Sequence, residues 1–192
     1  MYGDCKWRWL VYDLDHATSE MARQNADFRS FMIINSNRFY IALRTDEEFC
    51  RQFVLTAMDM MNSIFLTENV EKVLNEWEED LSYGSDYFLE RPEYMKQSLV
   101  NEFGLSGIEG QVTVDTNDAE VGTVSISTIT PELDNGAWSG QYFVDYPVTV
   151  TAVANPGYRF VGWTGDIEDY EESMDVIVKK EGVYVMAVFE KE

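Results

Sequence analysis

The sequence predicts an α+β protein in which an N-terminal strand and a mainly helical region precede a small antiparallel β domain. Up to Gly104, apolar residues recur at spacings of three and four, as one buried face of a helix requires. Beyond Gly104, short runs rich in Val, Thr and aromatic residues alternate with Gly, Pro, Asn and Asp, which is typical of antiparallel strands. We therefore expect a helical region at 1–104, a linker at 105–110 and a β domain at 111–192.

The first expected element is a strand at 7–12 that ends at two carboxylates, Asp13 and Asp15. Side chains alternate along a strand, so these acids would share one face with α-carbons about 6.5 to 7 Å apart. Like charges at that separation favour a bound cation, and one or two carboxylates are the usual protein ligands of Mg²⁺. A pair of surface acids is the simpler interpretation of so short a motif taken alone, and Arg38 or Arg44 could neutralise them instead of a metal.

A helix is expected to begin near residue 45, because Thr45 and Glu48 have the spacing of a capping box. In that motif Thr45 caps the first turn and Glu48 reaches back to the cap. The apolar positions that follow should form one buried face of the helix. They are Phe49, Phe53, Met60 and Ile64, with Cys50, Ala57 and Met61 beside them.

Two further helices are expected before Gly104. Thr67 can cap the second, and Pro92 would stand in the first turn of the third, which would end at Gly104. The second helix would bury Val70, Val73, Leu74, Trp77 and Leu81, and the third would bury Met95, Leu99 and Phe103.

Strands are expected at 111–116, 122–129, 147–154, 158–165, 174–179 and 183–190. A domain of this size would form a single small sheet or a compact barrel, with an aromatic core. Its expected core residues are Trp138, Tyr158, Phe160, Trp163 and Phe189. The linker at 105–110 contains two glycines and a serine, so it could act as a hinge.

The composition of the chain restricts the classes of binding partner and of reactive site that can be expected. The formal net charge is −21 in 192 residues, so we expect neither nucleic-acid binding nor attraction to an anionic membrane. No apolar run is long enough to span a bilayer, and the first residues lack the pattern of a signal peptide. Cys5 and Cys50 are too few for a disulfide framework, and a nucleophilic triad would have to use His16, the only histidine.

Two other segments could bind ligands. Six acids between Asp166 and Asp175 could hold Ca²⁺, although their spacing is not that of an EF-hand and a solvated charge run is the simpler interpretation. Tyr142, Phe143 and Tyr146, with Trp138, could form an aromatic surface for a glycan or peptide. Burial in a small domain is the more economical interpretation of these aromatics.

The run Gly-Tyr-x-Phe-x-Gly-Trp at 157–163, after the strand at 148–152, resembles the divergent internalin B-repeat module of Gram-positive surface and secreted proteins. Pro156 and Gly157 would make the turn, and Gly162 would leave room beside Trp163. The resemblance covers most of 111–190. It implies a β-grasp-like spacer or adhesive unit at the cell surface, with a protein or glycan partner and no enzyme activity.

The first half resembles the C-terminal part of the CotH family of atypical protein kinases. The matching features are the aromatic strand ending in Tyr12-Asp13-Leu14-Asp15, the helix from Phe49 into residues 60–65, and the closing segments 91–95 and 101–105. The resemblance implies a partial kinase-like C-lobe in which Asp13 and Asp15 are Mg²⁺ ligands, with ATP only in a full-length protein. The region that would carry the ATP-binding lysine and the catalytic aspartate is missing.

Two functions are therefore expected. The first is the C-terminal fragment of a secreted CotH-like kinase, inactive alone, with a surface β module. The alternative is a non-catalytic extracellular binding, adhesion or spacer protein.

Overall fold

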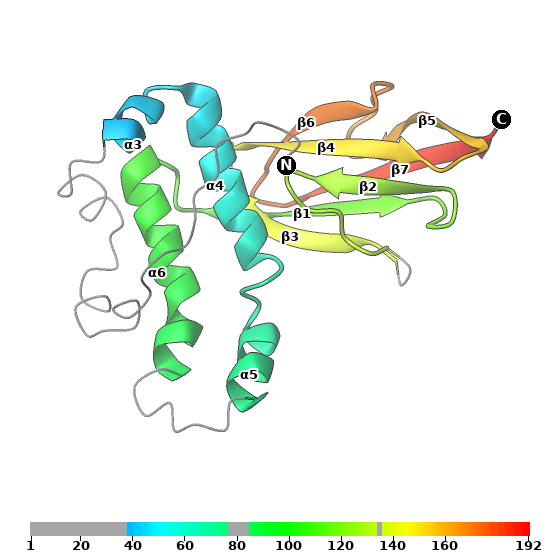
Figure 1. The fold of residues 1–192 in the computed structure, drawn as a ribbon. Helices are drawn as coiled ribbons and strands as arrows, with labels where there is room; N and C mark the ends of the chain where they lie inside the picture. The colour runs from blue at the N-terminus through cyan, green and yellow to red at the C-terminus, as the bar shows by residue number, and fades with distance from the viewer. Residues whose placement is uncertain (1–37, 77–84, 134–135) are drawn as a thin grey trace, which may run out of the picture.

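The computed structural model describes residues 38–76, 85–133 and 136–192 (Figure 1). In these ranges four helices precede seven strands, which confirms the α+β class. The helices are α3 (Arg38–Leu43), α4 (Glu47–Met61), α5 (Thr67–Glu76) and α6 (Ser85–Phe103). The strands are β1 (Glu109–Thr116), β2 (Gly122–Ile126), β3 (Trp138–Phe143), β4 (Pro147–Ala154), β5 (Tyr158–Gly165), β6 (Ser173–Ile177) and β7 (Val183–Lys191). The expected strand at 7–12 lies outside the described residues.

The strands form two open sheets. One has the order β3-β1-β7-β5, with β1 and β7 parallel and the other pairs antiparallel, and the second has the antiparallel order β2-β4-β6. Among the described strands no backbone ladder joins the edges of the two sheets, so the expectation of a compact barrel or a single sheet is wrong. The sheets instead share one apolar core, which is built from alternating inward residues such as Val112, Val114, Val148 and Val150.

The sequence did not predict β3. Its residues, Trp-Ser-Gly-Gln-Tyr-Phe, have little of the β-branched character of the other strands, but they pair with β1 from Glu109 to Val114. That pairing begins inside the expected linker, because β1 starts at Glu109 rather than at residue 111. The expected strand at 122–129 ends early, because Ser127 has a positive φ of 50° and the chain turns there.

Helix α4 begins one residue later than expected. The cap is Asp46, whose side chain accepts a hydrogen bond from the Phe49 amide at 2.8 Å, whereas the Thr45 hydroxyl bonds back to the Ala42 carbonyl. The buried face is also rotated from the expected one: Met60 and Ile64 are exposed, and Asp59 is buried. The buried residues of this helix are Val54, Leu55, Met58, Asp59 and Met61.

The other helices depart from expectation in their length and burial. Helix α6 begins at Ser85 and continues through Pro92, which therefore lies inside the helix rather than in its first turn. Its end at Gly104 is confirmed: that glycine has a φ of 65°, and its amide bonds the Val100 carbonyl. Helix α5 has no buried residue, and Val73, expected to be buried, is 53% exposed.

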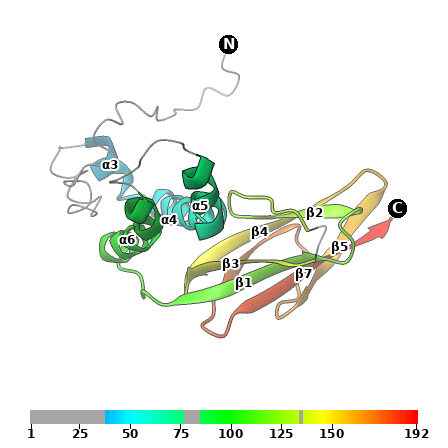
Figure 2. The ribbon, with the colours of Figure 1, turned by 90° about the horizontal axis from the view of Figure 1, so that it is seen from below.

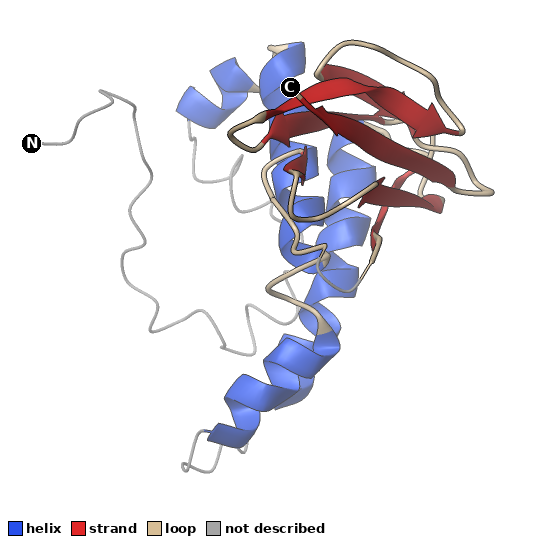
Figure 3. Ribbon diagram, turned by 90° about the vertical axis from the view of Figure 1, so that its right-hand side faces the viewer, coloured by secondary structure: helices blue, strands red, loops and turns tan. Residues whose placement is uncertain are grey.

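The helices lie on one side of the β-strands, and α4 lies between α6 and the sheets (Figures 1 and 2). The view in Figure 3 shows the red strands stacked in front of the blue helices. Residues of α4 and α6, including Val54, Leu55, Met58 and Leu99, belong to the same buried cluster as the core of the sheets. Within the described ranges, none of the helices has the length and apolarity needed to cross a membrane.

Candidate functional site

The acid pair of the sequence-based metal site, Asp13 and Asp15, lies outside the described residues, as do Cys5 and His16. In the part of the chain that the structure describes, no three His, Cys, Asp or Glu side chains are grouped to hold a metal ion. Arg44, considered above as a partner for the acid pair, forms an ion pair at 2.8 Å with the buried carboxylate of Glu102.

The acidic segment from Asp166 to Asp175 uses several of its carboxylates to organise the chain. Asp166 accepts a hydrogen bond from the Tyr184 amide at 2.8 Å, and Asp169 accepts one from the Glu171 amide at 2.8 Å. Asp175 contacts helix α4. These partners give three of the six acids, Asp166, Asp169 and Asp175, a structural role, and the ion-binding interpretation gains no support from their geometry.

The aromatic residues considered as a ligand surface are largely interior. Tyr142 and Phe143 are 0% and 2% exposed, and Trp138 and Tyr146 are half-buried. The interpretation as an exposed binding surface is therefore wrong, and burial in the core is confirmed. Tyr142 is buried where β3 meets helix α4, and its hydroxyl bonds Asp59 of that helix.

The Gly-Tyr-x-Phe-x-Gly-Trp run forms most of β5, and its aromatic rings pack against one another and against β7. Phe160 lies 5.6 Å from Trp163 and 5.8 Å from Phe189, measured between ring centroids, in edge-to-face arrangements. Trp163 and Phe189 are each 3% exposed, whereas Tyr158 and Phe160 are partly buried. The pairing of β5 with β7 shifts register between Phe160 and Gly162, so a bulge reverses the side-chain alternation and turns Trp163 inward.

Residues 112–192 match the family model of the divergent InlB B-repeat domain. The match covers the strands from β1 to β7 and none of the helices, so it confirms the resemblance of the β module alone. Searches of curated proteins and of solved structures find no match to this chain. The resemblance of residues 1–104 to CotH kinases stays a prediction. We refer below to residues 112–192 as the B-repeat-like module, and to its contacts with α4 as the α4 joint.

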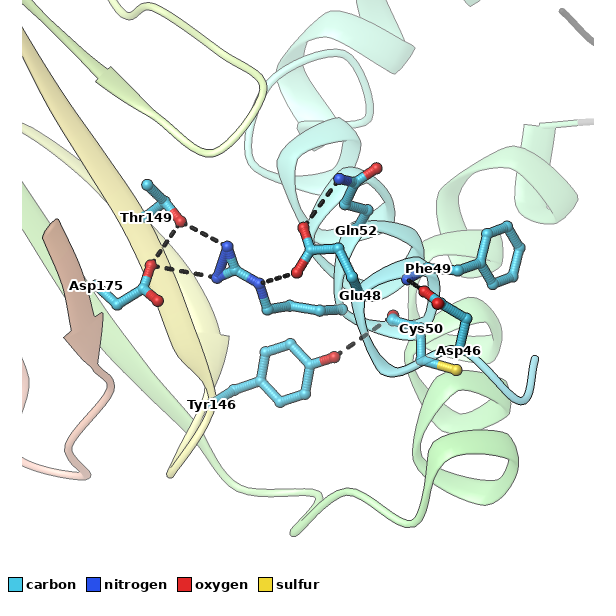
Figure 4. Close-up of polar contacts among 9 residues, drawn as sticks. Asp46, Glu48, Phe49, Cys50, Gln52, Tyr146, Thr149 and Asp175 are labelled. Atoms are coloured by element: carbon cyan, nitrogen blue, oxygen red, sulfur yellow. Dashed lines mark hydrogen bonds and ion pairs between the residues drawn. The ribbon is translucent and has the colours of Figure 1, made fainter. Parts of the chain in front are cut away.

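The first anchor of the α4 joint is Arg51, which bonds the labelled residues Glu48, Thr149 and Asp175 (Figure 4). Its guanidinium donates to the Thr149 hydroxyl on β4 at 2.8 Å and to the Asp175 carboxylate on β6 at 3.2 Å. The Thr149 hydroxyl in turn donates to Asp175 at 2.6 Å. Glu48, one turn earlier in α4, accepts from the Arg51 Nε at 3.1 Å and holds the side chain in place. Because three acceptors share one planar cation, Arg51 fixes α4 to both β4 and β6.

The second anchor is Asp59, which is 1% exposed. One carboxylate oxygen accepts from the Tyr142 hydroxyl at 2.7 Å. The other accepts from both the amide and the hydroxyl of Thr128, at 2.8 and 2.6 Å. A buried carboxylate is costly unless donors surround it, and here three donors from the module do so. Asp59 therefore connects α4 to β3 and to the turn that follows β2.

The third anchor is Asn62, the residue that caps the C-terminus of α4. Its side-chain amide donates to the Gln141 carbonyl at 2.8 Å, and its side-chain oxygen accepts from the Gln141 amide at 2.9 Å. Both bonds are made to the backbone of β3. Arg51 lies near the start of α4, Asp59 lies near its end and Asn62 caps it, and together these three anchors contact both sheets of the module.

Burial at the α4 joint shifts the titration of nearby tyrosines. Burial, followed by the charge of Asp59 and the hydrogen bond to it, raises the pKa of Tyr142 well above its ordinary value. Burial raises the pKa of Tyr146 to about 12, and its hydroxyl donates to the Cys50 carbonyl at 3.4 Å. Burial likewise raises the pKa of the Cys50 thiol, so this cysteine is a poor nucleophile.

A groove of about 550 Å³ lies between α5 and α6. Its lining is mainly apolar, with polar groups only at Asn69, Lys72 and Glu76. The apolar residues are Ile64, Phe65, Val70, Val73, Leu74 and Phe88. Among the described residues that line the groove, none is a nucleophile with an adjacent base, and their mainly apolar side chains offer a surface for contact.

No single motif in the sequence marks the α4 joint. Asp59 lies on the face of α4 that is buried in the structure, but it is not on the apolar face expected from the sequence, so its placement became a signal only once the buried face was known. A charged residue at a buried helical position predicts a polar partner across the interface.

Proposed function

We propose that this chain belongs to a secreted or surface protein, in which the B-repeat-like module is a spacer or adhesive unit held in a fixed orientation by helix α4. The observation that carries the proposal is the buried carboxylate of Asp59, whose three hydrogen-bond donors all come from the module. A buried charged contact of this kind is lost at high cost, so it favours a joint that stays closed. An adhesive or spacer unit benefits from such rigidity, because less conformational entropy is lost when its partner binds.

The proposed partner is a protein or a glycan at the cell surface, as the adhesive modules that this one resembles imply. A binding role fits the described residues better than catalysis does. Among the described candidates for a ligand or reactive site, Asp175 and Tyr142 are bonded within the fold. The high negative charge favours contact with basic surfaces and opposes contact with nucleic acid.

The rigidity of the joint can be tested with distance measurements between paired spin labels. One label would be placed at Val73 on α5 and the other at Val161 on β5, both exposed, in the full chain with Cys5 and Cys50 changed to Ser. We expect a narrow distance distribution that broadens in Asp59→Ala. The matched control is Gln52→Ala, an exposed position on the same helix whose side chain contacts only Glu48 in the described interactions. A broad distribution in the unmodified joint would refute the proposal.

The adhesive role needs its own test. The full chain would be immobilised and exposed to purified Gram-positive wall polysaccharide and, separately, to cell-surface protein extracts. We expect saturable binding to one of the two that survives physiological salt. Binding to neither would leave a spacer role and exclude the adhesive one.

The second candidate function is the C-terminal part of a CotH-like kinase, in which Asp13 and Asp15 bind Mg²⁺ and ATP is bound only by the full-length protein. It is favoured by two helical features at the positions that the resemblance implies. Phe49 and Phe53 lie in α4, and α6 ends at Gly104. The kinase activity itself would need an ATP-binding lysine and a catalytic aspartate from a preceding region.

A thermal-shift experiment tests the metal site directly. We expect Mg²⁺ or Mn²⁺ to raise the melting temperature of the chain, and Asp15→Asn to abolish that rise. Glu132→Gln, an exposed acid on the module, is the control for non-specific cation binding. Equal metal responses in the two variants would count against the site.

A further inference from the structure

Strand β3 is an edge strand whose outer side faces the end of helix α4. Among the described strands it pairs only with β1. An open edge presents unpaired amide and carbonyl groups and is a template for another strand. In this fold the backbone carbonyl and amide of Gln141 are both bonded to the side chain of Asn62. The carbonyl accepts a hydrogen bond at 2.8 Å, and the amide donates one at 2.9 Å.

The side-chain amide of Asn62 has the same donor and acceptor as a backbone peptide group. The Asn62 side chain therefore bonds Gln141 as a peptide group of a neighbouring strand would: it donates one hydrogen bond and accepts another. Gly140 makes this approach feasible. A Cβ at residue 140 would lie only 3.0 Å from the Asn62 side-chain amide and would overlap the ring of Trp138.

Charge does not protect this edge. The chain has 35 Asp and Glu residues, but the six residues of β3 include no charged side chain. Natural edge strands are commonly protected from pairing by charged residues, proline or a covering element. The covering element here is α4, held in place by the bond from Tyr142 of β3 to Asp59, one turn before Asn62.

We propose that Asn62 closes the β3 edge against strand addition, and that the edge, once opened, pairs antiparallel with β3 of a second copy of this chain. A second copy is the occupant that this edge fits best. An edge-to-edge pair about a two-fold axis brings identical donors and acceptors into register, and two uncharged strands can meet despite the net charge of −21 on each chain. The α4 joint thus controls self-association of the module.

The test compares Asn62→Ala with the unmodified full chain by sedimentation equilibrium over a range of concentrations. We expect the variant to approach twice the mass of the unmodified chain as concentration rises. Gln52→Ala, on the exposed side of the same helix, should sediment as the unmodified chain does. Adding Gln141→Pro to Asn62→Ala should reverse the association, because proline removes the outward amide of residue 141.

Three results would overturn the proposal. The first is a folded Asn62→Ala variant whose mass matches that of the unmodified chain at every concentration. The second is association that persists after Gln141→Pro is added, since the contact would then lie elsewhere. The third result needs no variant: fast hydrogen exchange of the Gln141 amide in the unmodified chain would show that the edge is already open.

If Asn62→Ala fails to fold, Asn62→Ser gives the same comparison with a polar residue kept at the helix cap.

Discussion

Arg51 of helix α4 and Asp175 of strand β6 are 124 residues apart in the sequence, and their side chains meet at 3.2 Å. The contact joins the helical region to the three-stranded sheet, while Asp59 and Asn62 join the same helix to β3 of the four-stranded sheet. One helix therefore fastens both sheets of the module, and its polar residues are the natural targets for testing the fold.

Removing the Asp59 carboxylate should cause a large loss of stability. In Asp59→Ala the Tyr142 hydroxyl and the Thr128 amide would be left buried without their acceptor. We expect the free energy of unfolding to fall by about 2 to 4 kcal/mol, measured by urea denaturation.

Tyr142→Phe is the matched control for that measurement, because it removes one donor and keeps the buried ring. It should lower the free energy of unfolding by only about 1 kcal/mol. The double variant should lose less than the sum of the two single losses. Additive losses would show that the Asp59 to Tyr142 hydrogen bond does not contribute to stability.

Replacing Arg51 should have a smaller, salt-sensitive effect. The side chain is 24% exposed, and its partner Asp175 is 53% exposed, so solvent screens the pair. We expect Arg51→Ala to cost about 1 kcal/mol and Arg51→Lys nearly as much, because lysine cannot bond Thr149 and Asp175 from separate nitrogens of a planar group.

The comparison for Arg51 is Arg159→Ala, which removes an ion pair with Glu190 on the module surface, where both side chains are largely exposed. That loss should be at most about 0.5 kcal/mol. Equal losses at Arg51 and Arg159 would mean that the Arg51 network adds nothing beyond an ordinary surface pair.

Alkaline pH should destabilise the joint through its tyrosines. Burial raises the pKa of Tyr146 from the ordinary 10.0 to about 12, so the folded state favours the protonated phenol. Its contribution to stability is fully present below pH 10.0 and is lost as the pH rises towards 12. Tyr142, whose pKa is raised in the same direction, should steepen the loss.

The measurement is the free energy of unfolding as a function of pH, together with the ultraviolet absorbance of ionised tyrosine. Tyr146→Phe should make the decline above pH 10 shallower, because it removes one titrating group. An unchanged decline would indicate that Tyr146 ionises equally easily in the folded and unfolded chain.

Gly110 should tolerate no side chain. A Cβ at this position in β1 would overlap the Lys179 carbonyl oxygen, which belongs to the backbone and cannot rotate away. We expect Gly110→Ala to lower the free energy of unfolding by about 1 to 3 kcal/mol. Gln111→Ala, at the next and exposed position of the same strand, should change it by less than about 0.5 kcal/mol. Similar values for the two variants would contradict the close approach.

Local patterns in the sequence predicted much of the fold. The end of α6 at Gly104 was predicted because a left-handed helix end favours glycine, and β4 and β5 were predicted from residue types that suit strands. Strand β3 escaped prediction, because Ser139, Gly140 and Gln141 interrupt its pattern and its pairing with β1 decides its conformation.

The rotated face of α4 has a similar cause. Periodicity shows that a helix has an apolar side, and it placed Met60 and Ile64 there, but Met60 lies on the exposed face of α4 and Ile64 lies beyond its end at Met61. The exact face depends on which surfaces pack against the helix. In this chain those surfaces are the module on one side and α6 on the other.

The sequence by itself determined the order of helices before strands and the resemblance of the β module, because both rest on short-range pattern and on motifs within one strand. Only the tertiary structure decided that Arg51, Asp59 and Asn62 bind the module. Their partners lie between 69 and 124 residues away, and a buried polar side chain is stable only where the folded chain brings its donors and acceptors to it.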